Sequence, residues 1–103
     1  EAVIPTGLAA AIPAGHVGIM AVRSSMGVRN GVCLSNGIGV IDSDYRGPLQ
    51  VALHNMRGTA YTIQPGDRIA QLMVVPVARP EVELTASLPE TARGEGGFGS
   101  TGR

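Results

Sequence analysis

Alternation of apolar and polar residues with a period of two is the main regular pattern in this chain. It is clear in "GHVGIMAVR", residues 15–23, and in "LQVALHN", residues 49–55. In the second run Leu49, Val51 and Leu53 fall on one face of an extended chain. Both runs therefore predict β-strands with one buried face.

Two further segments carry strand signals of another kind. "DRIAQLMVVPV", residues 67–77, is a mostly apolar run that Pro76 ends, which suits an edge strand or the last residues of a strand. "AYTIQPGD", residues 60–67, is a short β-rich run followed by a Pro-Gly turn. Strands at this spacing, separated by turn signals, point to an all-β sandwich, barrel or jelly roll.

Helical periodicity is scarce because almost every stretch of ten residues up to residue 80 contains Gly or Pro. One short helical turn is predicted in "SSMGVR", residues 24–29, with Ser24 as its N-cap. At most one short helix is therefore expected.

Composition limits the classes of function. The 103 residues suit a single domain, and eight basic residues balance eight acidic ones, so charge favours neither nucleic acid nor an anionic membrane as a partner. No apolar run approaches the ~20 residues of a membrane helix, and residues 1–20 lack the basic start of a signal peptide. The single Cys33 excludes an internal disulfide, fits a reducing, cytoplasmic location, and is interpreted as a buried small hydrophobe.

The character of the chain changes near residue 90. "ARGEGGFGSTGR" is rich in glycine and offers almost nothing to bury. We therefore expect one β domain over residues 1–90 and a flexible glycine-rich segment over residues 91–103. Phe98 is the only Phe and lies outside the apolar runs, so a role in core packing is not expected.

"AVRSSMG" offers Arg23, Ser24 and Ser25 at the end of a predicted strand. An arginine, small hydroxyls and free backbone N–H groups are common ligands of phosphate oxygens. An N-cap beside a surface arginine explains the same residues.

"GVIDSDYRG" places Asp42 and Asp44 on the same side of an extended backbone. Two such carboxylates could hold a metal or position a water, and a solvated turn between strands is the alternative. In "PGDRIAQL", Asp67 and Arg68 are predicted to form a surface ion pair, with Gln71 three residues further on.

Four segments follow one another in a fixed order: "RSSMG", "NGIGVIDSDYRG", "GDRIAQL" and "RGEGGFGSTG". This succession, which covers essentially the whole chain, resembles that of the trimeric dUTPase family, the deoxyuridine 5′-triphosphate nucleotidohydrolases. The resemblance implies the family's jelly-roll-like, distorted β-barrel (β-clip) fold and hydrolysis of dUTP to dUMP and pyrophosphate. It further implies a homotrimer in which each active site is shared between subunits, and Mg²⁺ held mainly by the triphosphate and by water.

The resemblance also assigns roles to individual residues. Asp42 would activate the attacking water, and Tyr45 would lie under the deoxyribose and exclude a ribose 2′-hydroxyl. Uracil would be bound by Asn36, by main-chain groups around Gly39 and Val40, and by stacking of Phe98. The phosphates would be contacted by Arg23, Ser24, Ser25, Gln71, Arg93, Ser100 and Thr101, the last three in a tail that closes over the substrate.

Two departures from the family pattern stand out. The family's first motif, an Ala-Gly-x-Asp-Leu-like segment, is expected some 25–30 residues before "PTGL", and the sequence begins after that point. The second motif reads "VRSS", where the family usually has Pro before the arginine. Two other readings remain open: a relative of dCTP deaminase, and a dUTPase-like protein that binds a nucleotide or partner without turning substrate over.

Overall fold

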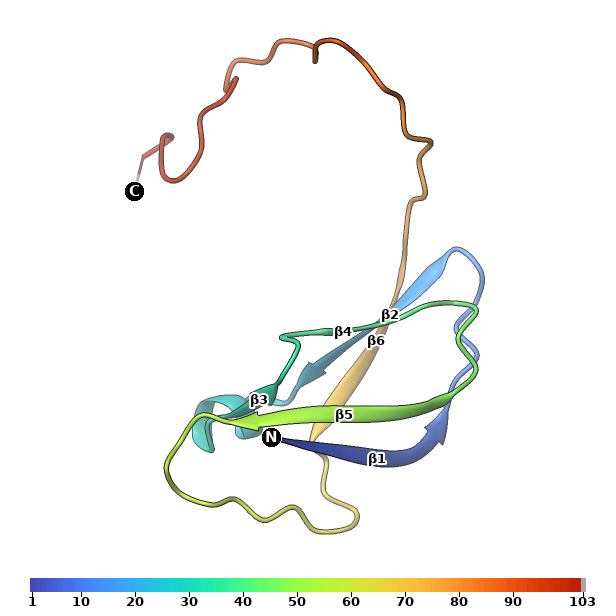
Figure 1. The fold of residues 1–103 in the computed structure, drawn as a ribbon, viewed down its shortest axis with the longest axis vertical. Helices are drawn as coiled ribbons and strands as arrows, with labels where there is room; N and C mark the ends of the chain where they lie inside the picture. Colours follow the sequence, from blue (N-terminus) through green and yellow to red (C-terminus); the bar gives the residue numbers. More distant parts are fainter. Residues whose placement is uncertain (103) are drawn as a thin grey trace.

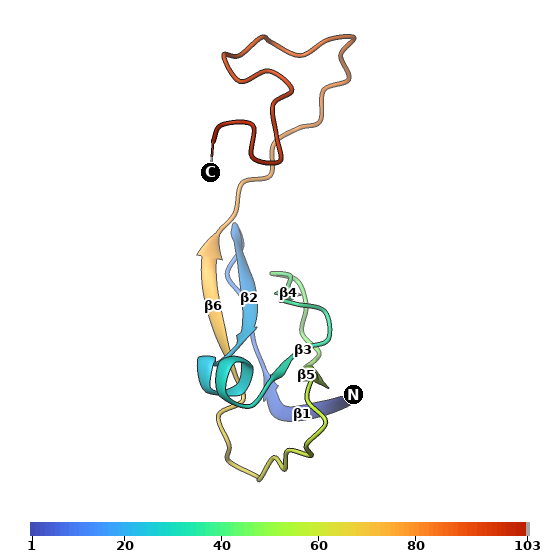
Figure 2. The same cartoon turned by 90° about the vertical axis from the view of Figure 1, so that its left-hand side faces the viewer.

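Two small antiparallel sheets, each of three strands, form the body of the chain in the computed structural model, which describes residues 1–102. One sheet has the order β1-β5-β3, and the other has the order β4-β2-β6. Figure 1 shows them one behind the other, and Figure 2 shows them from the side. The strands are β1 (Ala2–Ala9), β2 (His16–Val22), β3 (Val32–Leu34), β4 (Gly39–Ile41), β5 (Pro48–Asn55) and β6 (Ala70–Pro76).

The predicted all-β class is confirmed, but the sheets remain open and do not close into a barrel. The runs at 15–23, 49–55 and 67–77 become β2, β5 and β6. β6 lies at the edge of its sheet and ends at Pro76, as the sequence predicts. Pro76 is tolerated there because an edge strand has one row of backbone groups without a ladder partner.

Two strand assignments differ from the sequence pattern. Residues 60–63 form no strand, because no neighbouring strand pairs with them; the Pro-Gly turn that follows is present. β1 is not evident from the pattern, because Pro5 and Gly7 interrupt it. Proline is acceptable because β1 pairs only with β5, and the register shifts between Pro5 and Ala9.

The core lies between the sheets and draws most strongly on β5. Leu49, Val51 and Leu53 are buried on one face of that strand, as their alternation predicts. They pack in one cluster with residues from the other strands and loops, namely Met20, Met26, Val32, Leu34 and Ile69. The burial of Cys33 is a wrong prediction: its neighbours Val32 and Leu34 face the core, so the period of two turns the thiol outward to a half-buried position.

The predicted helical turn is present as η1 (Ser25–Arg29), a single wide turn of π type between β2 and β3. Met26 is its buried residue. Ser24 occupies the N-cap position, but its side chain makes no capping hydrogen bond, so the predicted capping role is wrong. The hydroxyl of Ser24 is exposed and available for other contacts.

Beyond β6 the chain leaves the sheets. Val77 N donates to Gly15 O over 2.9 Å, and further backbone hydrogen bonds of the described arm lie within the arm itself. Residues 78–102 arc away from the body without a strand or helix (Figure 1). Phe98 is fully exposed there, as expected for an aromatic without a core role. The expected segment 91–103 extends one residue beyond the described part of the chain.

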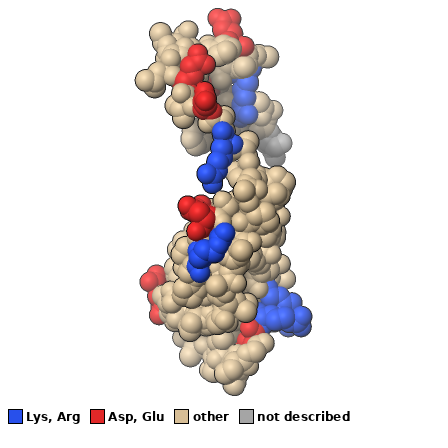
Figure 3. Space-filling model, turned by 90° about the vertical axis from the view of Figure 1, so that its right-hand side faces the viewer, with Lys and Arg blue, Asp and Glu red and all other residues tan. Residues whose placement is uncertain are grey.

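Charge is sparse on the molecular surface. In Figure 3 acidic and basic side chains are separated by larger areas of other residues, and neither sign forms a continuous patch on that face. Within residues 1–102, no helix has the length and apolar character required to cross a membrane.

The core assignment predicts a large difference between two identical substitutions. Leu53→Ala should lower the free energy of unfolding by about 2–5 kcal/mol, because Leu53 is only 4% exposed and its loss leaves a cavity. Leu88→Ala, at a side chain 82% exposed, should change it by less than about 0.5 kcal/mol. Urea denaturation followed by circular dichroism measures both, and equal losses would contradict this core.

Candidate active site

The end of β2 and the start of β6 bring together one set of the predicted phosphate ligands. Ala21 pairs with Gln71 and Val22 with Ala70 in the antiparallel ladder. The Gln71 amide donates to Val22 O over 3.2 Å, and the Arg23 guanidinium donates to Arg68 O over 3.5 Å. Arg23 and Gln71, which are 48 positions apart in the sequence, are therefore held side by side.

Ser24 and Ser25 extend this group. They directly follow Arg23, where β2 passes into η1, and both are exposed. The cluster of Arg23, Ser24, Ser25 and Gln71 thus combines a guanidinium, two hydroxyls and an amide at one sheet end. Such donors suit an anionic group with several oxygens.

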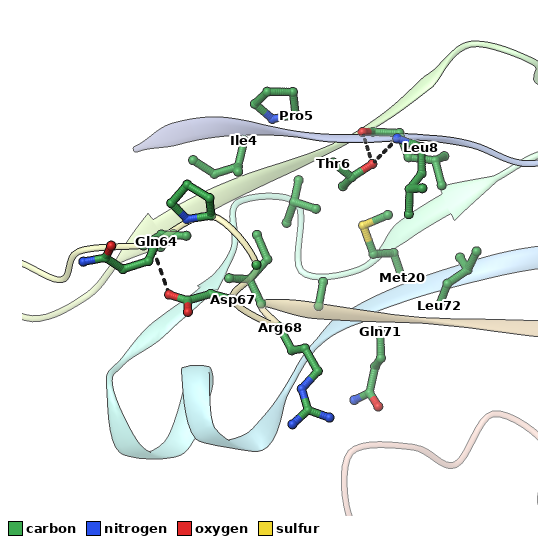
Figure 4. Close-up of a pocket in the computed structure, with 17 residues that line it drawn as sticks. Ile4, Pro5, Thr6, Leu8, Met20, Gln64, Asp67, Arg68, Gln71 and Leu72 are labelled. Atoms are coloured by element: carbon green, nitrogen blue, oxygen red, sulfur yellow. Dashed lines mark hydrogen bonds between the residues drawn. The ribbon is translucent and has the colours of Figure 1, made fainter.

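The turn before β6 corrects one prediction. Asp67 does not pair with Arg68: its carboxylate accepts from Gln64 N over 2.8 Å, and its own N–H donates to Gln64 O over 3.0 Å (Figure 4). A carboxylate that closes the turn locally is drawn away from the guanidinium. Arg68 points away from this turn in the same view.

The connection between β3 and β4, two strands of different sheets, carries Asn36, and β4 carries Gly39 and Val40, which are predicted to bind uracil. Asn36 lies exposed in the connecting turn, where Gly37 N donates to Leu34 O over 3.0 Å. Gly39 pairs with Met20, and a Cβ at Gly39 would approach the Met20 Cβ to 3.1 Å. Val40, next along β4, is exposed. Glycine therefore lets β4 lie close against β2.

Tyr45 is held by contacts within its own turn. Its hydroxyl donates to Pro48 O over 2.9 Å, and its N–H donates to Asp42 O over 3.2 Å. A Cβ at Gly47 would lie 2.6 Å from the ring carbon Cζ, so only glycine allows the ring to fold back over the chain. Gly47 is not among the predicted site residues, although the Tyr-x-Gly spacing is the signal that marks it.

A recess of about 290 Å³ lies between these elements. Val40, Ile41 and Asp42 form one part of its lining, and the remainder comes from Tyr45 and residues 48–50. Its volume is near the lower end of the range of roughly 300–1,000 Å³ for small-molecule sites. The recess suits a part of a nucleotide, such as a base with its sugar, better than a complete triphosphate.

The two aspartates of this stretch are placed differently. Asp42 lines the recess, whereas Asp44 does not contribute to it. Among residues 1–102, no three His, Cys, Asp or Glu side chains gather in a group that could hold a metal ion. The two carboxylates are therefore placed in different surroundings and do not line the recess as a pair.

Asp42 and Ser24 lie at opposite ends of β2. Ile41 pairs with Gly18, and Asp42 continues toward the start of β2, whereas Ser24 follows its end. At about 3.3 Å per residue the two are on the order of 20 Å apart. A water-activating group and a ligand of the attacked phosphate must both lie within hydrogen-bond reach of one centre. With the roles expected of Asp42 and Ser24, one chain alone does not satisfy that condition.

The tail is separated both from the recess and from the predicted phosphate ligands at the end of β2. Arg93 Nε donates to Gly96 O over 2.7 Å, and Ser100 N donates to Gly97 O over 3.1 Å, so the described contacts of this segment are local. Phe98 has a φ of 51°, an uncommon value for a residue with a side chain. Arg93, Phe98, Ser100 and Thr101 therefore reach neither the recess nor the phosphate ligands within this chain.

A larger groove of about 680 Å³ opens between β1 and the start of β6 (Figure 4). Its lining is predominantly apolar, with Ile4, Leu8, Met20 and Leu72 among its residues. Of the predicted site residues only Gln71 borders it, and Figure 4 shows that side chain directed away from the apolar residues. Size alone would select this groove, but the other predicted site residues lie outside it.

Comparison of the sequence with known proteins gives a consistent result. The dUTPase family model matches residues 1–102. Deoxyuridine 5′-triphosphate nucleotidohydrolase of Anaeromyxobacter sp. (strain Fw109-5) is 52% identical over 97% of this chain and 68% of the relative. The protein of that name from Roseobacter denitrificans is 50% identical over 99% of this chain and 67% of the relative.

Solved structures agree with the sequence comparison. A variant of the dUTPase of Staphylococcus bacteriophage 80alpha, with dUpNHpp, superposes with a TM-score of 0.84 at 29% identity, covering 99% of this chain and 76% of the other. A dUTPase variant from phage phi11 of S. aureus, described for its coordination of a structural Mg(II) ion, gives 0.71 at 26% identity over 84% and 72% of the two chains. The motif order, the fold and these matches together establish that the chain belongs to the dUTPase family.

Proposed function

We propose that the protein is a dUTP diphosphatase that hydrolyses dUTP to dUMP and pyrophosphate. The observation that carries the proposal is the recess that Asp42 and Tyr45 line at the end of β4. The family membership, and the dUpNHpp bound by the phage relative, supply the substrate class.

Asp42 is the proposed water activator. An aspartate is ionised at neutral pH and can accept a hydrogen bond from water. The oriented water attacks the α-phosphorus and would pass a proton to the Asp42 carboxylate. A new O–P bond forms, the bond from that phosphorus to the bridging oxygen breaks, and pyrophosphate leaves. Phosphoryl transfer requires little from the protein beyond alignment and charge compensation.

The segment that runs from the β3–β4 connection into β4 is the proposed uracil slot. Asn36 and main-chain groups at Gly39 and Val40 would bind the polar edge of the base. Cytosine exchanges donors and acceptors at that edge, so buried polar groups would be left unpaired, which discriminates strongly. A closely fitting backbone leaves no room for the 5-methyl of thymine.

Tyr45 is the proposed sugar gate. Its ring is fixed by the hydrogen bond to Pro48 O and by the contact over Gly47. A ring held at both points cannot move aside easily for a 2′-hydroxyl. Discrimination against UTP would thus depend on a rigid local turn.

The phosphates are assigned to the opposite end of β2. Ser24 would contact oxygens near the scissile bond, with Arg23, Ser25 and Gln71 on the remaining phosphate oxygens. In the tail, Phe98 would stack on uracil while Arg93, Ser100 and Thr101 close over the β- and γ-phosphates. Closure of a segment from residue 91 onward would exclude water from the reacting centre.

Mg²⁺ is the proposed cofactor. The triphosphate supplies the hard oxygen ligands that this ion prefers, with water completing its shell. The described residues offer no cluster of three acidic, His or Cys side chains, so this assignment places the ion on the substrate. When bound, it would neutralise charge on the phosphate oxygens.

A homotrimer with shared active sites completes the proposal. The separation of Asp42 from Ser24 along β2, and the arm that leaves the body at β6, both favour sites built from several copies. The second and fourth motifs would come from one copy, the third from a neighbour and the tail from the remaining one.

The proposed substrate specificity predicts the outcome of a nucleotide panel. Pyrophosphate release with Mg²⁺ should be fast with dUTP and far slower with dTTP, dCTP and UTP. Ammonia release from dCTP would instead indicate a deaminase. If the protein bound dUpNHpp but released no pyrophosphate from dUTP, it would be a non-catalytic nucleotide-binding protein.

Substitution of Asp42 should separate binding from turnover. Asp42→Asn retains the size of the side chain but removes the carboxylate that accepts from water, so kcat should fall about 10²-fold or more while dUpNHpp still binds. Asp44→Asn is the matched control and should retain most activity. Equal effects of the two substitutions on kcat would remove Asp42 from the catalytic role.

Mixing two inactive variants tests the shared site. Co-refolded Asp42→Asn and Ser24→Ala chains should recover about a quarter of the wild-type activity, because random assembly places both intact groups in about one site in four. Each variant refolded alone is the control. Absence of recovery, with mixed trimers shown by mass spectrometry, would contradict sites shared in this way.

The tail assignment is tested at its aromatic residue. Phe98→Ala should reduce kcat/KM while leaving thermal unfolding and the oligomeric state unchanged, because Phe98 is fully exposed in the chain. Base–aromatic stacking contributes about 1–3 kcal/mol, which corresponds to roughly 5- to 150-fold. Loss of the trimer would contradict a lid and indicate an assembly role instead.

A further inference from the structure

Arg57 links the loop after β5 to the far end of η1. Its guanidinium donates to Arg29 O over 2.5 Å and to Val28 O over 3.1 Å. These two carbonyls belong to the last residues of the turn, where backbone oxygens lack partners within a helix. A fork of two N–H groups on two carbonyls fixes direction as well as distance.

The approach of Arg57 to η1 is shaped by glycine. Gly31 is buried, with a φ of +67°, and a Cβ there would lie 2.7 Å from both Cγ and Nε of Arg57. Met56 N donates to Gly31 O over 2.9 Å. The arginine stem therefore lies flat against a backbone position that has no side chain.

The backbone of Arg57 is fixed as well. Its N–H donates to the Asn55 side-chain oxygen over 2.9 Å, and Asn55 pairs with Val32 in the β3–β5 ladder. The guanidinium is thus anchored to the sheet that holds most of the core. Movement of η1 relative to that sheet would break both side-chain hydrogen bonds.

Other attachments of η1 are few. Met26 is its buried residue, and Ser24 contributes no side-chain cap. The Asn30 side chain donates to Ser25 O over 2.9 Å, but this contact lies within the same local segment. Apart from its chain connections to β2 and β3 and the Met56–Gly31 backbone hydrogen bond, the turn is held by Met26 at one point and by Arg57 at its end.

We propose that Arg57 is a positioning residue, which holds η1 against the β5 side of the body and thereby places the Ser24 and Ser25 hydroxyls for the triphosphate. The inference rests on the proposed function, since it takes those hydroxyls to be phosphate ligands. Arg57 contacts the opposite end of the turn from them, so its effect on substrate passes through η1.

The first experiment compares two arginines of the same region. Arg57→Met should lower kcat/KM for dUTP about 10- to 100-fold, mostly through kcat, because small misplacement of a group at the scissile phosphate is costly. Arg29→Met removes the same charge from η1 itself, at an exposed side chain, and should stay within about twofold of wild type. Equal losses in the two variants would overturn the proposal in favour of charge attraction.

Arg57→Lys preserves the charge but not the planar fork. A lysine can reach one carbonyl as a point donor, so kcat should fall between those of wild type and Arg57→Met. Wild-type kcat in Arg57→Lys would overturn the role of the fork. If Arg57→Met folds poorly, Arg57→Lys still tests the proposal.

A double variant tests whether the effect of Arg57 on turnover passes through the Ser24 hydroxyl. In a Ser24→Ala background, Arg57→Met should lower kcat much less than in wild type, because the hydroxyl that Arg57 is proposed to position is already absent. Additive losses would show that Arg57 acts by another route and overturn the proposal.

Hydrogen exchange without nucleotide separates this inference from the proposed function. In Arg57→Met, amides of residues 25–31 should exchange faster while those of β5 remain protected. Unchanged exchange in η1 would overturn the anchoring itself. Failure of wild-type protein to release pyrophosphate from dUTP would instead reject the proposed function, with the exchange result still informative.

Discussion

The pairing of β2 with two neighbours is the constraint on which the rest of this structure depends. β4 and β6 both run antiparallel to it, and the registers place Ile41 opposite Gly18 and Ala70 opposite Val22. Gly18 makes the packing possible, because a Cβ there would approach both Ile41 and Leu72 to 3.1 Å. The two ladders of β2 therefore place the recess at one end of the strand and η1, with Ser24 and Ser25 at its start, at the other.

This division gives the dUTPase motifs separate physical tasks. The turn around Tyr45 is rigid because hydrogen bonds and a glycine fix its ring, and rigidity suits selection of a base and sugar. Ser24 and Ser25 present exposed donors at the start of η1, a short helical segment that Arg57 contacts at its other end. The arm would supply its proposed substrate contacts from a segment outside the sheets.

Sequence patterns predicted the parts that burial controls. The alternation of Leu49, Val51 and Leu53 identifies β5 because each side chain faces one core, and motif order identifies the family. Pro5 concealed β1, since an edge strand accepts proline that a central strand would not. Cys33 was misjudged because composition does not show which residues of a short strand face inward. Contacts such as Arg57 with η1 join distant segments and leave no periodic signal.

Closure of the proposed lid would cost conformational entropy, because the arm after Pro76 has to become ordered. Fully extended, residues 77–102 would span about 85 Å, well beyond the 53 Å longest dimension of the described chain, so reach does not limit where the tail docks. Ordering each residue costs about 1–2 kcal/mol, and glycine loses the most freedom. The closed state then persists only while bound phosphates and base offset that cost. Warming should favour opening, so in the proposed lid the same glycines that let the tail fold over a substrate would also promote the release of product.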